Sequence, residues 1–280
     1  MILVSSIEVI QKLIKKVRDH KKDYFTNFFF DIPKLELWIK LSLIEYEETD
    51  ETVLFCKKNC GFKNLYFCTT TLEILKRNIA LFISNHNDEI FVVDIVVNGT
   101  SFLGFKDGFF SNGFYLYTSL VRMSRTSNEL SNKVLNTKCI SIANKDNGLE
   151  VLKLLHKYFD IYAEQLPLIE DINRWVEKKG ILIYSDDYTT LQGFLIFELI
   201  GQTSYLRYWF VHPDYRDKKI GSALLGSFFK ESLNNKRQIF WVIESNINAI
   251  KRYEHYGFKK EDLFDYVMIN KDITYAEKNY

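Results

Sequence analysis

The sequence predicts an α/β protein of two domains, in which helices cover mixed sheets. The chain has 280 residues, which is long for one domain, because domains commonly run to roughly 100 to 200 residues. Apolar residues make up 47% of the chain and charged residues 26%, with only 3 prolines, a composition typical of a folded protein. Segments with helical spacing of apolar residues are interspersed with β-branched segments, as in folds that combine helices and a sheet.

Charge and cysteine content exclude several classes of function. The net charge is +1, so we expect neither a nucleic-acid partner nor attraction to an acidic membrane. The first residues show no signal-peptide pattern, and no apolar run approaches about 18 residues, which predicts a cytoplasmic protein without a membrane partner. Cys56, Cys60 and Cys68 lack the second ligand pair that a zinc site needs, so we expect ordinary thiols and no metal.

The first half of the chain is predicted to be an α+β domain. Apolar residues at helical spacing, such as Ile7, Ile10 and Ile14, predict amphipathic helices. The expected helices span 7–18, 35–44 and 72–84, and the expected strands span 53–55, 65–68, 90–97, 101–105 and 114–123. Asn-Gly pairs at 98–99 and 112–113 are typical of hairpin turns, which predicts an antiparallel meander for the last three strands.

A polar segment is expected to separate the two domains. Residues 141–148 end in Asn-Lys-Asp-Asn-Gly, which is typical of a linker, so the predicted domains are 1–145 and 146–280. In the second domain we expect helices at 149–162, 169–178, 218–233 and 246–256, and strands at 181–185, 193–200, 205–211, 238–243 and 266–270. This order is typical of a mixed central sheet covered on its faces. No internal repeat is evident in the sequence.

The segment from Leu206 to Leu225 carries the clearest chemical signal. Its pattern predicts a strand, a short loop and the first turns of a helix. The first N–H groups of a helix lack intrahelical partners and point, with the positive end of the helix dipole, toward one place that suits a pyrophosphate. Gly221 lets a ligand approach the backbone, and Arg216, Lys218 and Lys219 add positive charge. The end of the strand would leave backbone groups to pair with an extended amide, such as the pantetheine arm of CoA.

Two motifs on these elements resemble one known family. Residues 211–225, VHPDYRDKKIGSALL, resemble the acyl-CoA-binding motif of the GNAT N-acetyltransferase family. Residues 246–258, NINAIKRYEHYGF, are similar to the family's Asn-x-x-Ala-x-x-x-Tyr-x-x-x-Gly-Phe stretch, which runs through the helix after the fifth strand. The resemblance covers roughly residues 149 to 270, and it implies a GNAT fold there and acetyl-CoA as the co-substrate.

The resemblance also implies roles for individual residues. Phe210 and Val211 would offer backbone groups to pantetheine, and Asn246 would contact the same arm. The residues expected to surround the pyrophosphate are Arg216, Asp217, Lys218, Lys219, Ile220, Gly221 and Ser222. Tyr253 would lie near the CoA sulfur and protonate the departing thiolate, whose solution pKa near 8.5 makes a nearby proton donor useful. Without the motif, Tyr253 would be interpreted as a packing residue, and we expect Gly257 to be a helix C-terminal glycine.

Two features differ from the family pattern. Lys219 stands where the family usually has the first glycine of its phosphate loop, so a β-carbon there would tighten the loop. The strand at 205–211 carries no carboxylate or histidine in a place suited to a general base. Glu198, Glu244, a water chain and direct uptake of the neutral amine remain alternatives for removing the amine proton. Trp209 and Trp241 are expected either to pack in the core or to line an acceptor pocket.

These observations together predict an acyltransferase of the GNAT type. We expect transfer of an acetyl group from acetyl-CoA to a primary amine of a small molecule, such as an amino sugar, an amino acid or a polyamine, by direct attack. Acetylation of a protein or peptide, and a non-catalytic acyl-CoA-binding regulatory module, are the alternatives. The order of elements in residues 1–145 is loosely similar to part of a GNAT domain, which suggests the hypothesis of a degenerate GNAT-like domain. The sequence does not indicate an oligomeric state.

Overall fold

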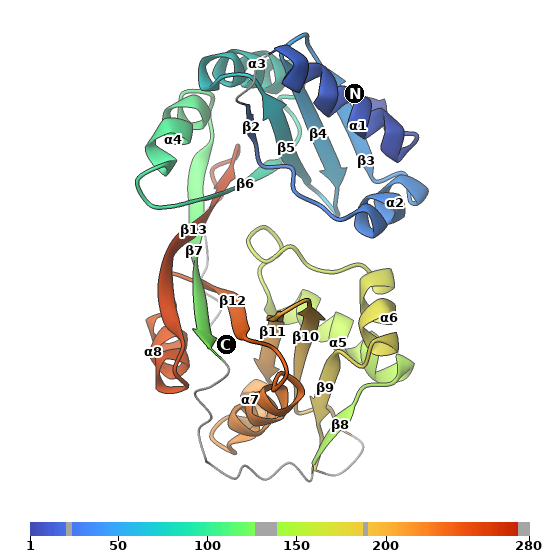
Figure 1. The fold of residues 1–280 in the computed structure, drawn as a ribbon, viewed down its shortest axis with the longest axis vertical. Coiled ribbons are helices and arrows are strands. Elements are labelled where there is room, and N and C mark those ends of the chain that lie inside the picture. The colour runs from blue at the N-terminus through green and yellow to red at the C-terminus, as the bar shows by residue number, and fades with distance from the viewer. Residues whose placement is uncertain (21–23, 127–138, 187–189, 274–280) are drawn as a thin grey trace. The chain divides into compact units, whose positions relative to one another are not determined.

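The chain folds into two compact units whose boundary lies inside strands. The computed structural model describes residues 1–20, 24–126, 139–186 and 190–273 (Figure 1). Unit 1 is Met1–Leu120 together with the described residues from Asp262 onward, and unit 2 is Val121–Glu261. The chain therefore passes between the units within strand β7, Tyr115–Thr126, and within strand β13, Lys259–Ile269.

The helices and strands of the two units have the following bounds. In unit 1 and its connections they are β1 Ile2–Leu3, α1 Ile7–His20, β2 Phe25–Thr26, α2 Ile32–Lys40, β3 Ile44–Glu48, β4 Thr52–Lys58, β5 Lys63–Thr69, α3 Leu72–Asn85, β6 Phe91–Val97 and α4 Phe102–Phe110. In unit 2 they are β8 Ile140–Ile142, α5 Lys145–Tyr158, α6 Ile169–Glu177, β9 Ile181–Tyr184, β10 Gly193–Ile200, β11 Thr203–Val211, η1 Pro213–Tyr215, α7 Ile220–Glu231, β12 Arg237–Ile243 and α8 Ile247–His255.

The boundary differs from the one that the sequence predicts near residue 145. Residues 140–142 form β8, which pairs with β9, and Asn144 caps α5 through a capping box with Asn147. The polar stretch is therefore a helix start inside unit 2 and not a linker, since Asn side chains satisfy the free N–H groups of a first helical turn.

The second difference concerns residues 98–110. The Asn-Gly pair at 98–99 does not form a hairpin, because α4 follows it and replaces the strand that the sequence predicts at 101–105. Phe102, Phe105 and Phe109 recur at helical spacing, and Phe102 and Phe109 are buried in the core of unit 1. The gain from burying these rings decides for the helix, so the predicted antiparallel meander is wrong.

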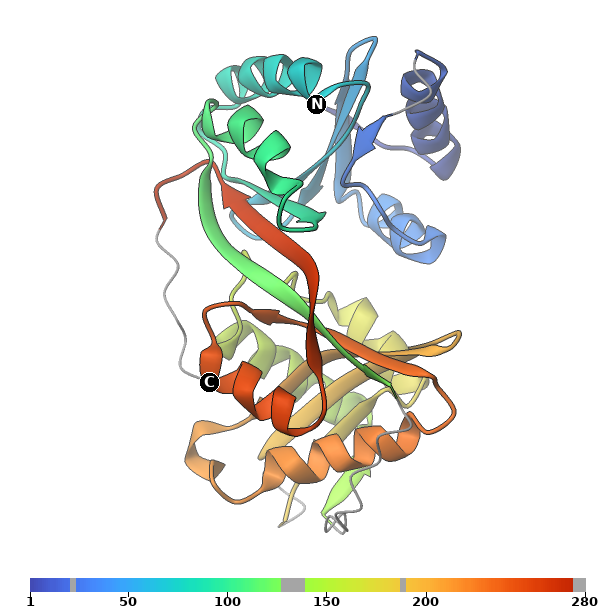
Figure 2. The same cartoon turned by 60° about the vertical axis from the view of Figure 1, so that its left-hand side comes forward.

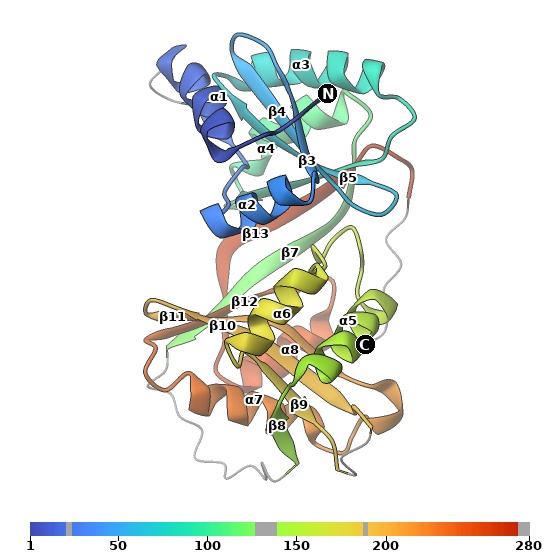
Figure 3. The ribbon, with the colours of Figure 1, turned by 90° about the vertical axis from the view of Figure 1, so that its right-hand side faces the viewer.

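Helices cover both faces of the strands in each unit. In unit 1 the apolar side chains of α3 and α4 pack on β4, β5 and β6, while α1 and α2 lie on the other side (Figure 2). In unit 2, α5 and α6 lie side by side and pack on Phe194 and Ile196 of β10 (Figure 3). The opposite face of β10 packs on α7, where the rings of Phe197 and Phe228 are 5.6 Å apart. Among the described residues, no helix is long and apolar enough to cross a membrane.

The same order of elements occurs twice along the chain. The series β3, β4, β5, α3, β6, α4, β7 matches the series β9, β10, β11, α7, β12, α8, β13. Pairing repeats as well, because the first three strands of each series are antiparallel neighbours and the third and fourth are parallel. The last strands are exchanged: Phe264–Ile269 of β13 pair with β6 in unit 1, and β7 is next to β12 in the strand order. This repeat supports the hypothesis that the first half is GNAT-like.

Candidate active site

A cavity opens in unit 2 where two parallel strands part. β11 and β12 are in register at Thr203–Tyr205 and Arg237–Ile239. Beyond these pairs, Leu206–Val211 and Phe240–Ile243 line a cavity of about 500 Å³. Its remaining walls are formed by Phe159, Glu164, Tyr215, Arg216, Asp217, Lys219, Ile220, Gly221, Ser222, Asn246, Asn248, Ala249, Arg252 and Tyr253. Parted strands leave peptide groups without partners across the sheet, so an extended amide ligand can pair with them.

The loop between β11 and α7 has an unusual backbone. Asp217 and Lys219 adopt left-handed conformations, with φ of 68° and 61°, and Lys219 is the N-cap residue of α7. Among the described residues no side chain caps this helix, so the N–H groups of its first turn stay available for an anion. Lys219 therefore adopts the backbone conformation that glycine adopts without strain, although it carries a β-carbon.

Gly221 packs closely against a neighbouring aromatic ring. A β-carbon at this position would lie 3.0 Å from Cζ2 of Trp209, which is closer than ordinary van der Waals contact. The Trp209 ring itself lines the cavity and lies near the ring of Tyr253, with centroids 5.5 Å apart. Close packing between α7 and β11 thus depends on this glycine, a reason that the motif alone does not reveal.

Tyr253 is held in α8, whose start is fixed by Asn246. The side-chain oxygen of Asn246 accepts a hydrogen bond from the Ala249 N–H at 3.1 Å, which caps the helix. Burial raises the pKa of Tyr253 above its ordinary value, and the Glu164 carboxylate adds to this rise against the opposing charge of Arg252. The phenol is therefore protonated at neutral pH and can donate a proton or a hydrogen bond into the cavity.

Most of the residues singled out in the sequence come together here. Those that line the cavity are Phe210, Val211, Arg216, Asp217, Lys219, Ile220, Gly221, Ser222, Asn246 and Tyr253. Lys218 does not line it, because its Nζ lies 4.8 Å from the ring centroid of Tyr215. Trp209 and Trp241 contribute to the cavity wall. Gly257 has φ of 85° directly after α8, which confirms the predicted C-terminal glycine.

The carboxylate in the cavity is not one that the sequence indicates. Glu198 and Glu244 do not line it. Burial opposes ionisation of Glu198, but its ion pair with Arg207, at 2.5 Å, contributes to holding the carboxyl pKa below its ordinary value. Glu164 does line the cavity, and its Oε2 accepts the Asp160 N–H at 2.7 Å. Glu164 lies between α5 and α6, far from both motifs in sequence, so no local signal points to it.

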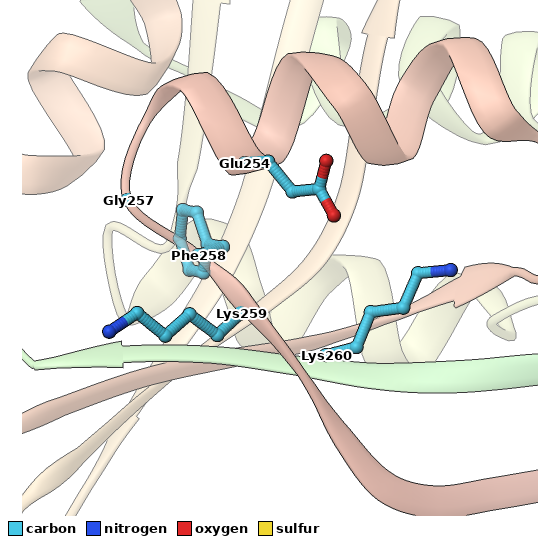
Figure 4. Close-up of a pocket in the computed structure, with 5 residues that line it drawn as sticks. All are labelled: Glu254, Gly257, Phe258, Lys259 and Lys260. Atoms are coloured by element: carbon cyan, nitrogen blue, oxygen red, sulfur yellow. The ribbon is translucent and has the colours of Figure 1, made fainter.

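A second hollow of about 370 Å³ lies where α8 ends and β13 begins. It is lined by Glu254, Gly257, Phe258, Lys259 and Lys260 (Figure 4). The side chains of Lys259 and Lys260 extend in opposite directions, so its charged groups do not converge on one point. The cavity between β11 and β12 is therefore the better candidate for chemistry.

Comparison with known proteins identifies a family for the segment that contains this cavity. Residues 149–258 match the model of the acetyltransferase (GNAT) family. No curated protein matches the sequence. Among solved structures, a GNAT-family acetyltransferase from Colwellia psychrerythraea is 16% identical, with 95% of this chain and 97% of that chain covered and a TM-score of 0.56. A GCN5-related N-acetyltransferase from Sphaerobacter thermophilus is 12% identical, with 95% and 94% covered and a TM-score of 0.57.

A third similar structure bears on the division into units. It is a tandem GNAT protein from the clavulanic acid biosynthesis pathway, solved without AcCoA, with 10% identity, 81% of this chain and 83% of that chain covered, and a TM-score of 0.54. Identities this low indicate a shared fold only, and a tandem layout fits the repeated order of elements. Residues 149–258 are therefore a GNAT acetyltransferase domain, a type of domain that catalyses acyl transfer.

Proposed function

We propose that unit 2 transfers an acetyl group from acetyl-CoA to a primary amine of a small molecule. The observation that carries this proposal is the cavity itself, because it joins the parted strands, the uncapped start of α7 and the buried Tyr253 in one place. Its volume of about 500 Å³ lies within the range of roughly 300 to 1,000 Å³ that is usual for small-molecule sites.

The donor would be held by backbone more than by side chains. Phe210 and Val211 would offer peptide groups to the pantetheine arm, and Asn246 would use its amide nitrogen, because its oxygen caps α8. The first turn of α7 would bind the pyrophosphate through N–H groups, with the cation of Lys219 beside it. Arg216, Asp217, Ile220, Gly221 and Ser222 would complete this loop.

Tyr253 would serve as the acid that protonates the departing thiolate. Its raised pKa keeps the proton in place until charge develops on the sulfur. Direct attack requires that amine and thioester be held in line, so positioning would supply much of the rate enhancement. When bound, acetyl-CoA supplies the activated acyl group.

Glu164 supports a cationic acceptor. Its position on the wall that it shares with Tyr253 places negative charge near the reacting centre, and such a charge attracts an ammonium group. The proton of that ammonium would leave through Glu164 or through water. Amino sugars, amino acids and polyamines all carry a suitable primary amine.

Thermal unfolding with acetyl-CoA, followed by an amine screen, tests the proposal. A ligand at about 100 times its dissociation constant adds roughly 2.7 kcal/mol of stability, so the melting temperature should rise by several degrees. CoA release should then be detected as free thiol with one class of small amines. Release with peptides alone would favour protein acetylation, and binding without release would favour a non-catalytic module. No shift at millimolar acetyl-CoA would contradict the proposal.

A further inference from the structure

A buried arginine lies at the C-terminal end of the helix that carries Tyr253. Arg125, on β7, is 4% exposed, and its Nη1 donates a hydrogen bond to the carbonyl oxygen of Tyr256 at 2.8 Å. Its Cζ lies 4.1 Å from the ring centroid of Phe229 and 5.7 Å from that of Phe258. Burying a cation is unfavourable unless it is paired or hydrogen-bonded, so contacts of this kind are required to retain it.

Tyr256 connects this arginine to two parts of the cavity. It is the C-cap residue of α8, so the guanidinium sits at the negative end of the helix dipole. The Tyr256 hydroxyl lies 2.6 Å from Oγ of Ser222, in the first turn of α7. The Tyr256 and Phe258 N–H groups both donate to the Tyr253 carbonyl, at 2.9 and 3.2 Å. One set of contacts therefore holds the last turn of α8 and the start of α7.

Arg125 lies outside the segment that matches the family, and it comes from the first half of the chain. Residues 149–258 contain Tyr253, but the strand that anchors the end of its helix is β7, whose residues 121–126 belong to unit 2. We propose that Arg125 is a positioning residue, which acts through Tyr256 to set the place of the Tyr253 hydroxyl. This inference rests on the proposed role of Tyr253 as the acid.

A double-mutant cycle on the full chain separates positioning from general stability. The variants are Arg125→Met, Tyr253→Phe and the pair, assayed with acetyl-CoA and ethanolamine, a minimal primary amine, by thiol release. Arg125→Met should lower kcat about 10-fold or more, with the acetyl-CoA dissociation constant changed less than about 3-fold, and Arg125→Lys should recover part of the loss. On the Tyr253→Phe background, Arg125→Met should cause little further loss, because the group that it positions is already gone.

The possible outcomes separate the two hypotheses. If Arg125→Met lowered kcat by the same factor in the unaltered chain and in Tyr253→Phe, the positioning role of Arg125 would be overturned. The proposed role of Tyr253 as the acid would still stand. Unchanged turnover in Tyr253→Phe would instead remove the acid itself, and with it the positioning role. Amide hydrogen exchange gives a readout that needs no turnover: Arg125→Met should speed exchange at the amides of Tyr256 and Phe258, and unchanged exchange there would also overturn the inference.

A different observation concerns the equivalent strands of unit 1. β5 and β6 hold the places that β11 and β12 hold in unit 2, and they too part, after the pairs Lys63–Phe91 and Asn64–Val92. Here the chain's own segment fills the opening. β2 pairs antiparallel with the end of β5, with Phe25 opposite Thr69 and Thr26 opposite Cys68.

Asn27 extends this contact across the gap. Its Oδ1 accepts the Phe67 N–H at 2.7 Å, and its Nδ2 donates to the carbonyls of Leu65 at 3.3 Å and Asp94 at 3.1 Å. A side-chain amide thus uses the strand groups that a pantetheine amide would need. We infer that segment 25–27 closes this opening, so that the chain binds one acyl-CoA, in unit 2.

Calorimetric titration of the intact chain with CoA tests this inference. We expect one site per chain, and we expect substitution of Gly221 by tryptophan to abolish all binding. Two sites, or binding that survives in Gly221→Trp with the stoichiometry of a second site, would overturn the closed opening while leaving the proposed function in place. If the unaltered chain bound no CoA at all, both the single-site inference and the proposed acetyl transfer would be overturned.

Discussion

The ring of Tyr253 packs on the ring of Phe240, with centroids 4.2 Å apart. Phenylalanine at position 253 would keep this contact and lose only the hydroxyl. Tyr253→Phe should therefore lower turnover by roughly 10- to 1,000-fold while leaving acetyl-CoA affinity nearly unchanged, because a proton donor acts in the transition state. Steady-state kinetics and calorimetry measure the two quantities. Unchanged turnover in Tyr253→Phe would remove Tyr253 from the mechanism.

Gly221→Ala should weaken acetyl-CoA binding by about 3-fold or more. The added β-carbon would meet the Trp209 ring at 3.0 Å, so either the ring or the start of α7 must move. Alanine raises helix propensity by about 1 kcal/mol relative to glycine, an effect that opposes the clash. Gly108→Ala in α4 is a matched control, because its β-carbon would meet its nearest neighbour at an ordinary 3.8 Å. Equal affinity in both variants would place the pyrophosphate elsewhere.

Lys219→Gly separates backbone strain from charge. A non-glycine residue in the left-handed region is strained by roughly 1 to 2 kcal/mol, so glycine should leave the melting temperature unchanged or higher despite its greater freedom in the unfolded chain. Acetyl-CoA affinity should fall a few-fold at low salt, because a cation is lost from the cavity. Lys218→Gly, whose φ is not positive, should instead lower the melting temperature and change affinity little. The reverse pattern would contradict this account of the loop.

Glu164→Gln should raise the KM of a cationic amine by about 10-fold, since the substitution removes the negative charge proposed to attract the ammonium group. Acetyl-CoA affinity should stay the same. Glu198→Gln is the matched control, because that carboxylate pairs with Arg207 and does not line the cavity. An unchanged KM in Glu164→Gln would show that the acceptor binds away from this carboxylate.

The contribution of one buried acid, Asp265, to the stability of unit 1 should fall as pH rises. Burial raises the pKa of Asp265 well above its ordinary value, and the neighbouring Asp94 raises it further. Such a group keeps its proton in the folded state where the unfolded chain has lost it, so its contribution is fully present below about pH 4 and is lost at higher pH. Asp265→Asn should thus raise the melting temperature more at about pH 8 than at about pH 5.

The comparison of the two pH values within one variant provides the control for this measurement. If Asp265→Asn shifted the melting temperature equally at both pH values, the proton uptake assigned to Asp265 would be wrong.

Local sequence patterns predict most elements of unit 2, and most residues of the two motifs line its cavity. The helical spacing in α7 and α8 and the runs of β11 and β12 are short-range patterns, so neighbouring residues suffice to determine them. The segment with Arg216 and Gly221 lies where one such element ends and the next begins, so its position in the chain follows from the same local patterns. The sequence predicts a strand in place of α4 because the Asn-Gly pair at 98–99 is typical of a hairpin turn, although Phe102, Phe105 and Phe109 recur at helical spacing.

Tertiary structure alone decided which distant residues meet. Glu164 reaches the cavity through the segment after α5, Arg125 reaches the end of α8 from β7, and Asn27 bridges β5 and β6 from far along the chain. The Nζ of Lys218 lies over the ring of Tyr215, and Lys218 does not line the cavity that its sequence neighbours line. Contacts of this kind depend on which strands pair and on which side chains become buried together. A local sequence pattern does not specify these long-range choices, because the free energy of such contacts is gained only when remote segments pack together.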